Sequence, residues 1–203
     1  MGGRRAIRIL SVAILAACTL AGMPQPKASQ TTVEVRFVSA SDEFAPAVRE
    51  YEHIWTADGA RIVAAMERIS GLSFVYEQFA DTSIAATVLE KPSSSGFRDA
   101  SGMELRASYP LDTKRATLIH ELGHRLMAGL YRRDEQEHGA LFLWIYDVWV
   151  ALYGKTFADE QVVVERRRGG PYPQAWDEAM RLSEAERAAQ WRAILAERLP
   201  RRR

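Results

Sequence analysis

The stretch TLIHELGHRLMAGLYRRDEQEHGALF, Thr117–Phe142, contains three of the four histidines in the 203-residue chain. His120, Glu121 and His124 form an HExxH pattern, and His138 follows later in the same stretch. On a helix, residues four apart lie on one face, a turn apart, so the rings of His120 and His124 can bind one ion together. The spacing therefore indicates a metal site on a helix.

The apolar residues of this expected helix support the same interpretation. They fall on a different face from the two histidines, at positions Ile119, Leu122, Leu126 and Leu130. In a chain with so few histidines, an HExxH pattern on an amphipathic helix rarely arises by chance. We therefore prefer a metal site to a pair of ordinary surface histidines.

Two helices are expected around the motif. Asp112 or Thr113 is a suitable N-cap for the first, which should end near Gly129. The second should span 134–153 and stop at Gly154. Because its segment ALFLWIYDVWVALYG is apolar on nearly every side, it should be buried in the protein.

The rest of the chain predicts an α+β fold. Apolar spacing indicates a helix over 43–69, with a kink or break at Asp58-Gly59 and a stop at Gly71. Strands are expected at 31–39, 72–80, 83–91 and 103–110, and further helices at 158–167 and 175–199. We expect a short mixed sheet packed on the two central helices, a helical C-terminal part, and a single domain over 31–203.

The first 28 residues have the pattern of an export signal. A basic start, MGGRRAIR, precedes an apolar run of about fifteen residues, too short to span a bilayer comfortably. Leu15–Cys18 resembles the lipobox of bacterial lipoprotein precursors, whose cysteine becomes a lipidated N-terminus and so a membrane tether. The alternative is a plain secretory signal cleaved near Ala28. Both predict an exported protein, either a periplasmic or cell-envelope lipoprotein or a secreted one.

The overall charge and the single cysteine exclude several kinds of protein. A formal net charge of +1 gives no field that would favour nucleic acid or an anionic membrane surface as a partner. Cys18 is the only cysteine, so the chain forms no internal disulfide and has neither a cysteine nucleophile nor a four-cysteine zinc site in its mature part.

The HELGH motif resembles that of the zincin metallopeptidases. This resemblance implies a small zincin-like domain, one Zn²⁺ ion bound by His120 and His124, and Glu121 as the general base that activates water for peptide-bond hydrolysis. It also implies that the strand before the motif, 103–110, forms the edge on which an extended peptide or protein substrate lies.

The third metal ligand depends on the subfamily. The longer metzincin motif requires Gly at position 127 and His at position 130, where this chain has Met127 and Leu130. An antiparallel second helix starting near 134 would regain the level of the metal around 138–141. Spartan-type proteases take a histidine at about this spacing, whereas thermolysin-like enzymes take a glutamate. We therefore prefer His138, with Glu137 as the alternative.

Asp147 interrupts the apolar second helix and needs a partner, because a buried carboxylate loses its hydration. It is expected either to accept the free ring N–H of a ligand histidine or to pair with an arginine such as Arg125.

The sequence thus predicts an exported zinc-dependent metallopeptidase. The alternative is a non-catalytic binding domain of zincin fold that uses zinc only to hold its helices together.

Overall fold

The structure is a computed structural model that describes residues 33–74, 83–96, 102–131 and 137–199. The export signal with Cys18 and most of the strand expected at 72–80 lie outside the described residues.

Three short strands form a parallel sheet in the order β1-β2-β3. They are β1 (Glu34–Ser39), β2 (Ser83–Leu89) and β3 (Met103–Arg106), and both neighbouring pairs run parallel. The expected mixed sheet is therefore wrong for the described strands. Between β1 and β2 the chain crosses over through a long helix, a connection that lets the second strand start in the same direction as the first.

That crossover helix, α1 (Ala45–Ser70), follows a short 3-10 turn, η1 (Asp42–Phe44). Gly71 ends it with a φ of 70°, as the sequence predicts. The break that was the alternative to a kink at Asp58-Gly59 is absent, because the helix continues without interruption through both residues. A Cβ atom at Gly59 would lie 2.9 Å from the Trp55 ring, so glycine here makes room for an indole and does not break the helix.

The two central helices are α2 (Leu111–Leu126) and α3 (His138–Tyr153). Pro110 occupies the N-cap of α2, so the expected caps Asp112 and Thr113 lie inside its first turn. α3 begins at His138, four residues later than expected, and ends before Gly154, whose φ is 88°. As predicted, α3 is buried, and it contacts α1, α2, α4, α5 and α6.

Three further helices complete the C-terminal part: α4 (Lys155–Arg166), α5 (Tyr172–Met180) and α6 (Glu184–Arg198). Gly169 and Gly170, both with positive φ, turn the chain between α4 and α5. Ser183 and Glu186 form a capping box at the start of α6, which splits the helical stretch expected at 175–199 into two helices.

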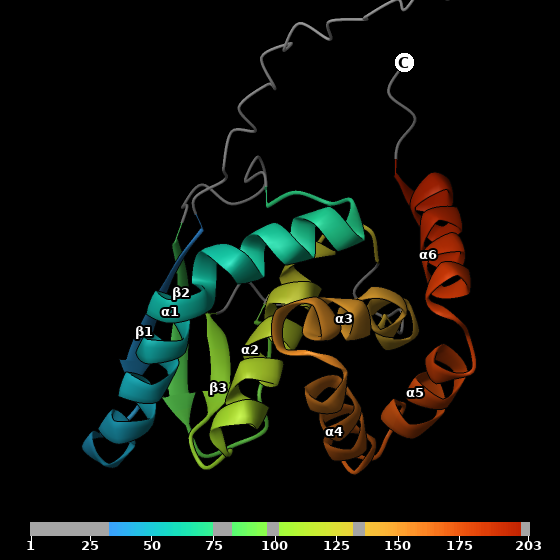
Figure 1. Cartoon of the computed structure of the whole chain (residues 1–203). Helices are drawn as coiled ribbons and strands as arrows, with labels where there is room; N and C mark the ends of the chain where they lie inside the picture. Colours follow the sequence, from blue (N-terminus) through green and yellow to red (C-terminus); the bar gives the residue numbers. More distant parts are fainter. Residues whose placement is uncertain (1–32, 75–82, 97–101, 132–136, 200–203) are drawn as a thin grey trace, which may run out of the picture.

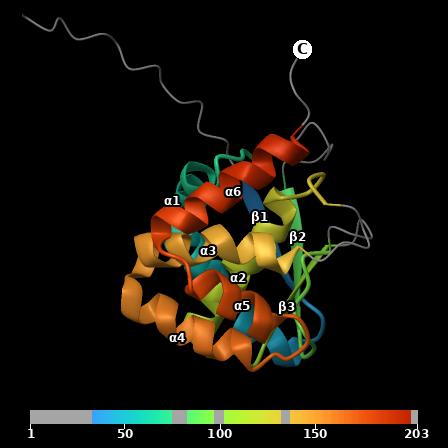
Figure 2. The ribbon, with the colours of Figure 1, turned by 90° about the vertical axis from the view of Figure 1, so that its right-hand side faces the viewer.

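The sheet lies on one side of the molecule and α4, α5 and α6 on the other, with α2 and α3 between them (Figure 1). The view in Figure 2 shows α6 crossing over α3, which it contacts. The buried apolar residues of the described chain form one core cluster, which includes Trp144, Trp149, Trp176 and Trp191. Among the described helices, none has the length and apolar character needed to cross a membrane.

Candidate metal site

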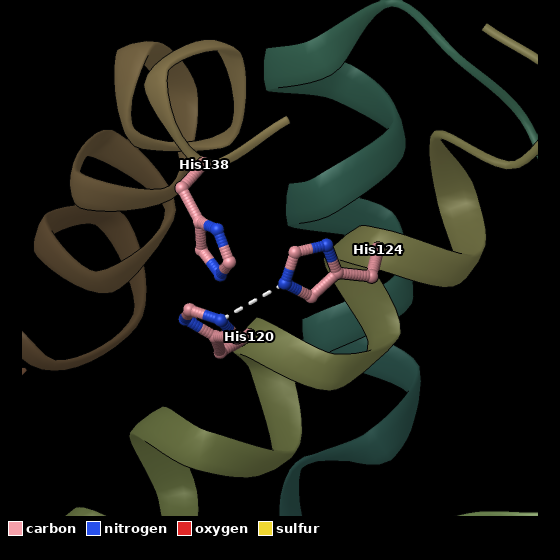
Figure 3. Close-up of side chains that lie close together, drawn as sticks. All are labelled: His120, His124 and His138. Atoms are coloured by element: carbon pink, nitrogen blue, oxygen red, sulfur yellow. Dashed lines mark hydrogen bonds between the residues drawn. The ribbon is translucent and has the colours of Figure 1, made fainter. Parts of the chain in front are cut away.

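The buried face of α2 brings the two motif histidines together. His120 and His124 are 0% and 5% exposed, and their Nε2 atoms are 3.0 Å apart. The half-buried His138 joins them from the first turn of α3, so that one ring nitrogen from each of the three residues lies within 4.8 Å of the others. Figure 3 shows the three rings converging on one space between the two helices.

The spacing of the His120 and His124 nitrogens is close to what a zinc ion requires. With Zn–N bonds of about 2.0–2.1 Å, a tetrahedral ion holds two nitrogen ligands about 3.3 Å apart. The separation between His120 and His124 is already close to this value. Three imidazoles with a fourth position left to water are a ligand set found at catalytic zinc sites.

Two buried carboxylates contact the Nδ1 atoms of the motif histidines, which are the ring nitrogens that point away from the cluster. Glu165 of α4 places its Oε1 2.9 Å from Nδ1 of His120, and Glu137 places its Oε1 2.8 Å from Nδ1 of His124. A carboxylate at Nδ1 favours a proton there, which leaves the Nε2 lone pair available to a metal ion. Glu137 thus contacts His124, and His138 is the third member of the histidine cluster.

Glu165 is itself held on both sides. The Trp176 indole donates a hydrogen bond of 2.9 Å to its Oε2, and Arg168 Nη1 lies 3.7 Å from its Oε1. Burial works to raise the pKa of the Glu165 carboxyl, but His120 and Arg168 outweigh it and bring the pKa below its ordinary value. The carboxylate therefore stays charged inside the protein.

His138 is held in its neutral form. Burial lowers its pKa to about 3, and the neighbouring His120 and His124 act in the same direction. A neutral imidazole keeps a lone pair for a metal ion, so no proton has to leave before His138 binds one.

Tyr172, the first residue of α5, is a member of the site that the sequence does not reveal. Its hydroxyl lies 3.0 Å from Nε2 of His138 and 3.4 Å from Nε2 of His120. Burial, followed by the charge of Glu121, raises the pKa of the Tyr172 hydroxyl, so it keeps its proton and can donate it in a hydrogen bond. The chain has seven tyrosines, and no spacing relative to the motif distinguishes this one.

Glu121 lines a cavity of about 370 Å³ beside the histidines. The other lining residues are Ser93, Ser94, Ser95, Gly96, His124, Glu137, His138, Pro171 and Tyr172. Glu121 is only 4% exposed, so its carboxylate faces this cavity and not the outer surface. A small molecule entering the cavity would meet two glutamates, two histidines and a tyrosine.

The segment before β3 pairs with part of the strand edge on which a substrate was expected to lie. Ser94 and Glu104 form an antiparallel bridge with backbone hydrogen bonds of 2.9 and 2.8 Å. The outer side of β3 is therefore occupied at Glu104. It is the segment 93–96, and not the strand expected at 103–110, that forms the wall of the cavity.

Asp147 pairs with an arginine, the second of its two expected kinds of partner, and not with the ring of a histidine. Its carboxylate forms an ion pair with Arg187 of α6, in which the arginine Nε lies 3.2 Å from Oδ2. Arg125 instead donates to the carbonyl oxygen of Ser95. The predicted pairing of Asp147 with an arginine is therefore confirmed, but the arginine is Arg187 and not Arg125. α6, distant in sequence, folds back over α3 and supplies this counter-charge.

Comparisons of the chain with protein-family models, with curated proteins and with solved structures give no match. The assignment of the site therefore depends on the chemistry and geometry of these residues.

Proposed function

We propose that the protein is a zinc-dependent metallopeptidase that hydrolyses peptide bonds in a peptide or protein substrate. The observation that carries the proposal is the convergence of His120, His124 and His138 beside a cavity lined by Glu121. The carboxylates that contact Nδ1 of His120 and Nδ1 of His124 support the proposal, because such contacts orient imidazoles toward a metal ion.

A bound zinc ion would lower the pKa of a water ligand and polarise the carbonyl of a substrate. Glu121 follows His120 on α2 and faces the same cavity, so it is the group that would take the proton from water and pass it to the leaving amine. Glu121 is not one of the two glutamates that contact a histidine Nδ1 atom, so its carboxylate is available to act as the base.

The Tyr172 hydroxyl is suited to a second task. It is protonated and lies within 3.4 Å of two of the three ligand nitrogens, so a carbonyl oxygen at the metal would be within reach of its O–H. A donor held in this position stabilises negative charge that develops on the oxygen during attack by water.

Export is part of the proposal and rests on the sequence of residues 1–28 alone. Under this proposal the enzyme acts in the periplasm or cell envelope, tethered through a lipidated Cys18, or as a secreted protein.

Replacement of Glu121 tests the catalytic assignment. Glu121→Gln keeps the size of the side chain but removes the base, so the variant should bind one zinc ion per chain and lose peptide cleavage by a factor of about 10² or more. Cleavage is measured on a peptide library by mass spectrometry, and metal content by elemental analysis. Glu160→Gln, on the exposed side of α4, is the matched control and should cleave like the wild type.

Two outcomes would contradict the proposal. If Glu121→Gln cleaves peptides as fast as the wild type, Glu121 is not the general base of the reaction. Zinc binding without cleavage by the wild type, together with a lower melting temperature after chelation, would favour the non-catalytic domain with a structural zinc.

A further inference from the structure

Arg168 lies at the edge of the metal site. It follows α4 by two residues and precedes the Gly169-Gly170 turn that leads into α5. Its side chain is only 18% exposed, although arginine is normally a surface residue. A charged group with so little exposure needs several partners, and two of those of Arg168, Glu165 and Tyr172, themselves contact histidines of the site.

The first two partners of the guanidinium are Thr117 of α2 and Glu165 of α4. Arg168 Nη2 donates a hydrogen bond of 3.0 Å to the hydroxyl of Thr117, which lies one turn before Glu121 on α2. Arg168 Nη1 lies 3.7 Å from Oε1 of Glu165, the same oxygen that contacts Nδ1 of His120. The arginine therefore holds the carboxylate that orients a ligand histidine.

The other two partners are aromatic rings. The guanidinium carbon lies 5.6 Å from the ring centre of Tyr109 and 5.7 Å from that of Tyr172, both within the range of a cation–π contact. Tyr172 is the residue whose hydroxyl contacts His120 and His138. Arg168 is thus in contact with both groups, Glu165 and Tyr172, that approach His120 from the C-terminal helices.

We propose that Arg168 is a positioning residue for the metal site, which sets the orientation of His120 through Glu165 and the orientation of the Tyr172 hydroxyl through its ring. The inference deepens the proposed function and rests on it, because it assumes that His120 binds a metal ion. A planar guanidinium is suited to this role, since it can donate hydrogen bonds in its plane while its faces lie against aromatic rings.

Metal binding tests the inference without an assay of activity. The probes are Zn²⁺, titrated in competition with a chromophoric chelator, and Co²⁺, whose visible absorption reports the number and geometry of its ligands. Arg168→Met keeps an apolar side chain of similar length and removes the guanidinium. We expect it to weaken Zn²⁺ binding about 10- to 100-fold, as loss of the group that orients a ligand commonly does, and to change the Co²⁺ spectrum.

The matched control is Arg166→Met. Arg166, the last residue of α4, pairs with α5 through Asp177, and this ion pair involves none of the three histidines. Arg166→Met should keep the affinity and the spectrum of the wild type. Arg168→Lys restores the charge but not the planar donors, so its affinity should lie between those of the wild type and Arg168→Met.

Each outcome decides the inference. Unchanged affinity and spectrum in Arg168→Met would overturn it, as would an equal loss in Arg166→Met. If Arg168→Met does not fold, Thr117→Val decides, because it removes only the hydroxyl that Arg168 binds and should weaken metal binding in the same direction. A wild type that binds no metal would refute the proposed function itself, whereas normal binding by both the wild type and Arg168→Met would refute only the role of Arg168.

Discussion

At the level of single residues, Tyr172 gives the sharpest test of the proposed chemistry. Tyr172→Phe removes a hydroxyl that lies 3.0 Å from His138 and keeps the ring that packs against Arg168. Loss of one donor to a developing oxyanion typically costs about 10²- to 10³-fold in kcat. We expect that loss in steady-state peptide cleavage, with KM and zinc content nearly unchanged.

A second tyrosine serves as the control for this prediction. Tyr146→Phe removes a hydroxyl that donates to Asp159, away from the three histidines, and should leave kcat as it is in the wild type. Equal kcat values for Tyr172→Phe and the wild type would exclude Tyr172 from the reaction.

The sequence predicts the histidines of the site but not the groups that support them. His120 and His124 are visible because a single helix fixes their spacing, and His138 because the chain must turn back soon after that helix. Glu165 and Tyr172 approach from helices much further along the chain, so their positions depend on how α4 and α5 pack on α2. No local pattern encodes that packing.

At the level of helices, Gly123 determines how closely α2 approaches α3. A Cβ atom at this position would lie 2.6 Å from Cδ1 of Leu141 and 3.3 Å from Cη2 of Trp144. Gly123→Ala should therefore push the two helices apart and lower the free energy of unfolding by about 1–3 kcal/mol, measured by urea denaturation. Because His124 and His138 lie on these two helices, zinc affinity should fall as well.

Gly139→Ala is the opposite case on α3. No heavy atom of the described residues lies within 4 Å of the position its Cβ would take, and the residue is already helical. Alanine should then raise the free energy of unfolding by about 0.5–1 kcal/mol, because it loses less backbone entropy on folding than glycine.

A gain in stability from Gly123→Ala would show that α2 and α3 are not tightly packed at Gly123.

Helix and strand positions follow from the sequence better than their boundaries and directions do. Alternation locates β1 and β2, but a period of two is the same in parallel and antiparallel strands, so the expected mixed sheet could not be distinguished from the parallel one. α3 starts at His138, directly after Glu137, whose carboxylate contacts the ring of His124. Such a tertiary contact is not visible in a pattern of apolar residues.

At the level of the whole molecule, the stability of the metal-free protein should depend on pH through His138. Its folded pKa is about 3 because of burial and then of His120 and His124, whereas an unfolded histidine titrates near 6.5. Between these values the unfolded chain binds the additional proton. The contribution of His138 to stability is therefore complete above about pH 6.5 and is lost as the pH falls toward 3.

Urea denaturation in the presence of a chelator checks this dependence between pH 4.5 and pH 7. One such site contributes a slope of no more than about 1.4 kcal/mol per pH unit. His138→Asn should flatten the profile, whereas the exposed His53→Asn should leave it unchanged. A profile that is identical in His138→Asn and the wild type would contradict the prediction.

A metal ion bound at the proposed site, finally, should stabilise the molecule as a whole. Its proposed ligands come from α2 and α3, and their carboxylate partners from the start of α3 and from α4. An ion that binds only the folded state at about 1,000 times its Kd adds about 4 kcal/mol. For a chain of this size that corresponds to a rise in Tm of roughly 8–16 °C. Calorimetry before and after chelation should show this difference in the wild type and none in His138→Ala. If the wild type, verified by elemental analysis to have lost its metal, melts at an unchanged temperature, these helices do not depend on the ion.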